Sequence, residues 1–326
     1  MDGAGVRRDQ KIRWACNVKL RKALEKRQPR SALDSYMLSY LSEADENGAI
    51  SVSSFKDSSD AYKIAGKYAR EHLRDSAKAG FAQALVEVGA KEQQSAPESA
   101  IKHYREAAEM GLASGMKDLG FMLAVGQAPR GKDAAQAMSW TRRAAKGGDI
   151  YAMVNLAAFY ERLKVEGSSE QEAQKWVENA VATGHSLGFM EKGLALLNGP
   201  YGYPINPPTG VALLQKAAAT GHSFALGQLA YFYSDGIGVK KNHKMSLLLA
   251  KAAWIQGNTS SLKTIAWCYK KDPQLAKDKA AANYWSLLAT GGGLAFAMGR
   301  DKPGKELATE LANLDPFTIK LPKETE

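Results

Sequence analysis

The feature of this sequence that most constrains its fold is a glycine that returns at a nearly fixed interval along much of the chain. Small residues stand shortly before most of these glycines, as Ala144-Ala145 does before Gly148. The series has intervals of 31 to 37 residues and consists of Gly80, Gly111, Gly148, Gly184, Gly221, Gly257 and Gly291. A fixed period in this range predicts a stack of similar helical units, because a single unit can bury its apolar side only against its neighbours.

Each unit predicts two helices. After the glycine come a small residue, a leucine four positions later and often an aromatic, as in Ala225, Leu229 and Tyr233. Spacings of three and four place these residues on one face of a first helix. A loop follows, clearest at Gly236-Ile237-Gly238, and then a second helix. That helix carries a large residue near its start in five units: Trp140, Trp176, Leu213, Leu248 and Trp285.

Short polar residues mark where the second helices begin. Asp133, Asn206 and Asp278 occupy equivalent positions, four residues ahead of the small residue that opens the second-helix pattern. A side-chain oxygen at such a position can accept a hydrogen bond from a free amide of the first helical turn. We predict capping at these three residues, and a structural role also for His185 and His222, which each follow a periodic glycine.

The order of these residues resembles the SEL-one-like repeats, which are relatives of the tetratricopeptide repeat. The unit from Gly221 to Gly257 is similar to the family pattern nearly throughout, and the resemblance covers roughly residues 80 to 293. It implies an all-α fold, a right-handed α-solenoid of helix-turn-helix repeats with helical caps at both ends. The expected organisation is a cap at 1–57, a basic helix followed by an acidic one, then the array at 58–293 and a closing cap and tail at 294–326.

Composition bounds the function. The chain has 326 residues and a net charge of +10. Residues 1–30 hold ten Lys or Arg against three acids, so this segment alone carries +7. Nucleic-acid binding through this basic segment is one alternative, although lysines and arginines on one helix face are more often solvated or paired with acids. No apolar run reaches the roughly 18 residues of a membrane span. We expect the chain as written to be cytoplasmic, or periplasmic if a leader was removed before Met1.

The sequence offers no constellation that would predict catalysis, a metal or a cofactor. The five histidines include no pair at the spacing of a helical metal site. Cys16 and Cys268 stand near opposite ends of the chain and predict buried free thiols. The glycine-rich Gly236–Val239 loop follows a helix and lacks a phosphate-binding lysine, which excludes a nucleotide-binding loop. We therefore expect a non-enzymatic protein with no small-molecule substrate.

The resemblance implies a binding groove built from the first helices. In the related tetratricopeptide repeat, groove positions lie about five and two before the consensus leucine, and two, five and six after it. Carried onto this chain, they predict partner contacts at Phe121, Tyr151, Glu161, Arg162, Met190, Phe224, Tyr231, Asp235, Lys263, Trp267, Lys270 and Lys271. Rigid aromatics beside charges are typical of protein-binding hot spots. The alternative is that these aromatics pack between adjacent first helices.

An insert interrupts one unit and offers a second candidate surface. The segment 199–208 is rich in proline and tyrosine, which suits a stiff projecting loop that presents Tyr201 and Tyr203. The alternative is a spacer.

The expected partner is another protein. The most specific interpretation is a bacterial immunity protein that neutralises a toxin, of the phospholipase type delivered by type VI secretion, through its groove. The alternative in the same class is an adaptor scaffold in envelope assembly or signalling.

Overall fold

The computed structural model describes residues 70–126, 133–163 and 169–290 and seven isolated positions: Leu24, Leu33, Asp34, Met37, Leu38, Leu314 and Ile319. Apart from these positions, the predicted caps at 1–57 and 294–326 lie outside the described residues, as does Cys16. Every regular element within the described ranges is a helix. The predicted all-α solenoid class is therefore confirmed.

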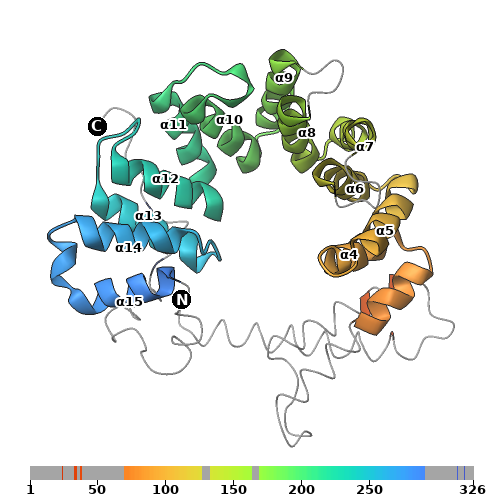
Figure 1. The fold of residues 1–326 in the computed structure, drawn as a ribbon, viewed down its shortest axis with the longest axis horizontal. Helices are drawn as coiled ribbons and strands as arrows, with labels where there is room; N and C mark the ends of the chain where they lie inside the picture. Colours follow the sequence, from red (N-terminus) through yellow and green to blue (C-terminus); the bar gives the residue numbers. More distant parts are fainter. Residues whose placement is uncertain are drawn as a thin grey trace, which may run out of the picture. The chain divides into compact units, whose positions relative to one another are not determined.

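The helices follow one another as alternating first and second members of pairs (Figure 1). Residues 70–78 are also helical and precede the first of these pairs. Between residues 82 and 289 the pairs are α4 (Ala82–Glu92) with α5 (Pro97–Glu109), α6 (Ala113–Val125) with α7 (Ala134–Lys146), α8 (Ile150–Arg162) with α9 (Glu170–Ala182), α10 (Ser186–Asn198) with α11 (Pro207–Ala218), α12 (Ser223–Asp235) with α13 (His243–Ile255), and α14 (Ser261–Lys271) with α15 (Lys279–Ala289). The 3-10 turns η3 (Pro200–Gly202) and η4 (Leu275–Lys277) lie in two of the connections.

The chain divides into two compact units, Met1–Ala152 and Met153–Glu326. In the first unit, α4 packs on α5, α5 on α6 and α6 on α7. In the second, each helix from α9 to α15 packs on the next one along the chain. First helices of successive pairs also touch, α4 on α6 and α12 on α14. Such contacts between neighbouring first helices create a shared surface.

The periodic glycines owe their spacing to backbone conformation. From Gly80 to Gly257, each glycine of the series has a positive φ, between +75° and +92°. This left-handed conformation ends the second helix and turns the chain into the next first helix, and side chains with a Cβ rarely adopt it. The period in the sequence is therefore the period of one obligatory turn per helix pair.

The predicted caps form. The side chains of Asp133, Asn206 and Asp278 accept hydrogen bonds from the amides of Gln136, Thr209 and Ala281, at 2.9, 3.3 and 2.9 Å. At the first helices, the Nδ1 atoms of His185 and His222 accept from the amides of Leu187 and Ala225, at 3.1 and 3.3 Å. These bonds satisfy amides that have no partner inside the helix, so the prediction of structural roles for both histidines is confirmed.

Small residues let paired helices approach closely. A Cβ on Gly193 of α10 would lie 2.8 Å from the carbonyl oxygen of Gly210 of α11, and one on Gly210 would lie 2.7 Å from Leu197. Large residues fill the remaining space, and Trp285 and Trp176 are buried at 0% and 8% exposure. These alternating small and large residues account for the dense packing that holds the first helices in register.

Candidate functional site

Four of the predicted partner-contacting aromatics lie on the surface. In the first unit, Phe121 is 39% exposed and Tyr151 is 57% exposed. In the second unit, Phe224 and Tyr231, both on α12, are 42% and 46% exposed. Aromatic side chains with this exposure present apolar surface to solvent, and another molecule could contact them there.

In the first unit, Tyr151 lies beside a polar pair on α6. The Lys117 ammonium is 6.0 Å from the centre of the Tyr151 ring and forms an ion pair with Asp118. Burial raises the pKa of the Asp118 carboxyl, while the hydrogen bond and charge of Lys117 oppose the rise. This small group places one exposed aromatic next to a partly buried ion pair.

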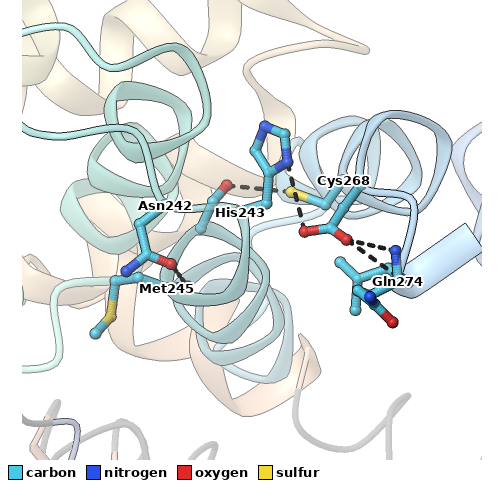
Figure 2. Close-up of polar contacts among 8 residues, drawn as sticks. Asn242, His243, Met245, Cys268 and Gln274 are labelled. Atoms are coloured by element: carbon cyan, nitrogen blue, oxygen red, sulfur yellow. Dashed lines mark hydrogen bonds and ion pairs between the residues drawn. The ribbon is translucent and has the colours of Figure 1, made fainter.

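In the second unit, Trp267 of α14 is half-buried and held on two sides. The His243 ring meets it edge-on, with centroids 5.4 Å apart, and the Lys241 ammonium lies 5.6 Å from its centre. His243 in turn contacts Asp272, with 3.6 Å between Nδ1 and Oδ2 (Figure 2). The ring of Trp267 is therefore contacted on two sides by residues of its own unit.

The carboxylate of Asp272 is engaged by backbone amides and by His243. It accepts hydrogen bonds from the amides of Gln274 and Leu275, at 2.8 and 3.3 Å (Figure 2). The hydrogen bond from Gln274 is the main cause that lowers the pKa of Asp272, and the charges of His243 and Lys244 act in the same direction. Asp272 thus ends α14 and orients His243 as an ionised carboxylate.

Cys268, next to Trp267, is a buried free thiol, as predicted. Its Sγ lies 3.2 Å from the hydroxyl of Ser246 (Figure 2). This hydroxyl donates a hydrogen bond to the backbone carbonyl of Ala230. Burial raises the pKa of the Cys268 thiol. A thiol kept protonated inside a helix interface is a packing residue and a poor nucleophile.

The remaining predicted residues divide by exposure. Six charged ones are exposed: Glu161, Arg162, Asp235, Lys263, Lys270 and Lys271. The carboxylate of Asp235 raises the pKa of Tyr231 through a hydrogen bond and its charge, which ties these two side chains of α12 together. Met190, however, is 7% exposed and Tyr201 is 5% exposed. The accessibility expected of Met190 and Tyr201 was therefore wrong, because α10 turns Met190 into the core and the Tyr201 side chain is buried within the second unit.

The insert packs against the helices beside it. The Tyr201 hydroxyl donates to Glu191 of α10 at 2.5 Å, and its carbonyl accepts from the Gln174 side chain at 2.8 Å. The Tyr203 hydroxyl donates to Glu178 of α9 at 2.7 Å. A stiff loop that presents Tyr201 to a partner is excluded, since this tyrosine closes a polar contact inside the second unit. Tyr203 remains partly accessible.

Two hollows of the second unit were not foreseen. One, of about 750 Å³, lies between α11 and the loop before α13, and three lysines line it: Lys216, Lys240 and Lys241. The other, of about 400 Å³, lies between α14 and α15 and is lined by Trp267, Lys270 and alanines. The adjacent pair Lys240-Lys241 after the glycine-rich loop was the available sequence signal for the first hollow.

Across 70–126, 133–163 and 169–290, no group of three or more His, Cys, Asp or Glu is arranged to hold a metal ion. Among the helices that the structure describes, none is long and apolar enough to cross a membrane.

Helix pairs, periodic left-handed turns and exposed first-helix aromatics define a helical-repeat scaffold. The chain belongs to the Sel1 repeat family: the Sel1 repeat model matches residues 89–112, 113–149, 150–185, 187–222 and 223–258, more than half of the chain. This confirms the resemblance to the SEL-one-like repeats. The structure adds a further helix pair, α14 and α15, after the last matched repeat.

Solved structures with the same fold support this assignment. A protective antigen of uropathogenic Escherichia coli with an SLR fold is 23% identical, with a TM-score of 0.53 over 82% of this chain and 56% of that chain. This chain therefore spans little more than half of that protein. A Sel1 repeat protein from Oxalobacter formigenes is 25% identical, with a TM-score of 0.51 over 71% of this chain and 94% of that one.

A third structure is more distant. The immunity protein Pa5087 from Pseudomonas aeruginosa is 18% identical, with a TM-score of 0.48 over 64% of this chain and 81% of that one. A likeness at this level carries no conclusion about this chain. No curated protein sequence matches it.

Proposed function

We propose that this protein binds another protein through the surface shared by α12 and α14. This α12–α14 face consists of Phe224, Tyr231, Asp235, Lys263, Trp267, Lys270 and Lys271. The observation that carries the proposal is that Phe224 and Tyr231 are 42% and 46% exposed on a first helix that packs against the helix of Trp267. Exposed aromatics beside charges form the hot spots of protein interfaces.

The geometry of this face favours binding because two of its aromatic side chains are already held by neighbouring residues. Trp267 is held between His243 and Lys241, and Tyr231 is tied to Asp235. Side chains that are already fixed lose little conformational entropy when a partner docks, so more of the contact energy becomes affinity.

Within this role we infer an inhibitory task, that of an immunity protein which binds and neutralises a secreted toxin of the phospholipase type. A scaffold with a preformed aromatic face is suited to cover the active site of a folded enzyme, and the Sel1 repeat family is consistent with a binding role. Co-expression with candidate toxins, scored by cell survival, tests this step. Survival that does not depend on the chain excludes the inhibitory task and leaves an adaptor role.

Affinity capture tests binding by the α12–α14 face. The full chain and its Tyr231→Ala/Trp267→Ala variant serve as baits in lysate of the source cells, followed by mass spectrometry and titration of the retained protein. We expect the double variant to bind at least about tenfold more weakly, as for hot-spot residues. Ile255→Ala is the matched control, because Ile255 is 40% exposed on a second helix. A partner retained equally by all three baits would place the binding surface elsewhere.

A further inference from the structure

Six exposed lysines gather around Trp267 and the hollow beside α11. Three of them line the larger hollow, at positions 216, 240 and 241. The other three, Lys263, Lys270 and Lys271, lie four residues before Trp267 and three and four after it. This spacing places them on the same side of α14 as the tryptophan. Together the six lysines and Trp267 form what we call the lysine–tryptophan surface.

Lys241 connects the two parts of this surface. It lines the larger hollow, and its ammonium lies 5.6 Å from the centre of the Trp267 ring. Trp267 and Lys270 line the smaller hollow between α14 and α15. A ligand that crosses Lys241 would therefore reach both hollows.

The positive charge of this surface is not neutralised by neighbours within the part of the chain that the structure describes. No salt bridge there engages any of the six lysines, and no carboxylate lines either hollow. The nearby Asp272 contacts His243 and two backbone amides, and Asp235 is paired with Tyr231. Clustered lysines raise one another's electrostatic energy, and an anionic ligand relieves that repulsion.

We propose that the lysine–tryptophan surface binds an acidic segment of the protein partner, with its carboxylates on the lysines and an apolar side chain against Trp267. The proposal rests on the proposed function and specifies the chemistry of the partner. The smaller hollow suits an apolar side chain, since Ala266, Ala282 and Ala289 line it beside the tryptophan. The larger hollow, with three ammonium groups, suits carboxylates.

The same geometry disfavours a nucleic acid as the ligand. Single strands bind by stacking bases on open aromatic faces. Trp267 is half-buried, Lys241 covers its ring, and the His243 ring meets it edge-on. A side chain of a peptide can use the rim of such a ring, whereas a base needs its face.

Fluorescence anisotropy on the full chain tests the proposal with a defined probe. The probe is a labelled glutamate-rich peptide of about twelve residues with one phenylalanine, which spans about 40 Å when extended. The matched peptide carries glutamine in place of each glutamate. We expect only the glutamate peptide to bind measurably. Its affinity should fall at least about tenfold between about 50 and 300 mM salt, because salt screens exposed charges.

Variants assign the binding to this surface. Lys241→Gln/Lys270→Gln should lower the affinity for the glutamate peptide at least about tenfold, because each change removes an exposed charge that would contact the peptide. The matched control is Lys146→Gln/Lys175→Gln, which removes two exposed lysines of other helices and should leave the affinity unchanged. Equal binding of the two peptides, or unchanged affinity in the Lys241/Lys270 variant, overturns the proposal. So does tighter binding of an oligothymidylate strand through the same two lysines.

The result can be separated from that of the affinity capture. If capture depends on Tyr231 and Trp267 but is unaffected by Lys241→Gln/Lys270→Gln, the binding face stands and its preference for acidic segments is wrong. If the glutamate peptide needs both lysines while capture is unaffected by Tyr231→Ala/Trp267→Ala, the lysines bind acidic segments, but the proposed face and the apolar contact to Trp267 are wrong.

Discussion

The insert at 199–208 and the α12–α14 face have similar ingredients and opposite structures. Both place tyrosines next to carboxylates. In the insert, Tyr201 turns inward, is 5% exposed and donates its hydroxyl to Glu191. On α12, Tyr231 is 46% exposed beside Asp235. One tyrosine–carboxylate pair fastens a loop to its helices, whereas the other remains on the surface.

The difference shows that the position of the carboxylate decides what a tyrosine does. Glu191 belongs to α10, which the turn of the insert contacts, and burial raises the pKa of this carboxyl. A desolvated carboxylate needs a donor, so Tyr201 is drawn in even though its backbone adopts a positive φ of 62°. Asp235 lies one turn along the same helix as Tyr231 and is solvated, so it exerts no comparable pull. The following experiments test this contrast.

Removing the Tyr201 side chain should have the largest effect on stability. Tyr201→Ala leaves a cavity and strips Glu191 of its donor, so we expect the free energy of unfolding to fall by about 3 kcal/mol. Urea unfolding followed by circular dichroism measures the change. Tyr203→Ala, which removes a partly exposed ring from the same insert, should cost less. An equal loss in the two variants would mean that burial of Tyr201 contributes nothing specific.

Removing only the Tyr201 hydroxyl should show how much the hydrogen bond to Glu191 contributes to stability. Tyr201→Phe should cost about 1 to 3 kcal/mol, the range for a buried polar group left without its partner. The pKa of Glu191 is already raised above its ordinary 4.5 by burial, and the hydrogen bond from Tyr201 opposes that rise. The contribution of Glu191 to the stability of the fold is therefore complete at a pH below 4.5 and is lost as the pH rises through the pKa of the folded state.

The Tyr201→Phe variant should therefore lose more stability at about pH 7 than at about pH 4, where Glu191 is protonated. Urea unfolding of wild type and variant at the two pH values makes the comparison. Glu191→Gln in the Tyr201→Phe background is the control, since an amide does not titrate. A deficit that is the same at both pH values in Tyr201→Phe would show that Glu191 is not the group concerned.

The sequence predicted the repeat but not the fate of the insert, for a physical reason. Helix spacing and the periodic glycines depend on local backbone geometry, which a single unit already contains. The burial of Tyr201 depends on Glu191 and Gln174, ten and 27 residues away, on two different helices. Met190 was misplaced because a groove position carried over from a related repeat can be rotated by one residue, which moves a side chain by about 100° around the helix. The lysines at 240 and 241 lie in a loop, where no helical period applies.

Both regions include a helix that begins at a histidine cap. His185 caps α10, which leads into the insert, and His222 caps α12, which carries Tyr231. Burial lowers the pKa of His222, with a further contribution from the charge of His185. The cap needs an unprotonated Nδ1, so its contribution is full above the ordinary 6.5 and is lost as the pH falls from there through the folded pKa.

Exchange of the His222 cap isolates this effect. His222→Ser keeps an acceptor that does not titrate. The free energy of unfolding of this variant should match that of wild type at about pH 7.5 and exceed it at about pH 5 by up to about 1 kcal/mol. Thermal unfolding at the two pH values measures both differences. His222→Ala should be weaker by about 1 kcal/mol at the higher pH. If the serine variant gains nothing on acidification, protonation of His222 does not weaken the cap of α12.

The smallest stability change should come from Tyr231, a residue of the proposed binding face. Tyr231→Ala truncates a side chain that is 46% exposed, and surface changes of this kind stay within about 0.5 kcal/mol. Urea unfolding tests the first half of this prediction, and titration with the captured partner tests the second, a loss of at least about tenfold in affinity. Tyr201→Ala should do the opposite: it should lose much stability but keep its affinity for the partner, measured at a temperature where both variants are folded. If Tyr231→Ala proves as destabilising as Tyr201→Ala, its ring packs between first helices as a structural residue, and any lost binding would then be a consequence of lost packing.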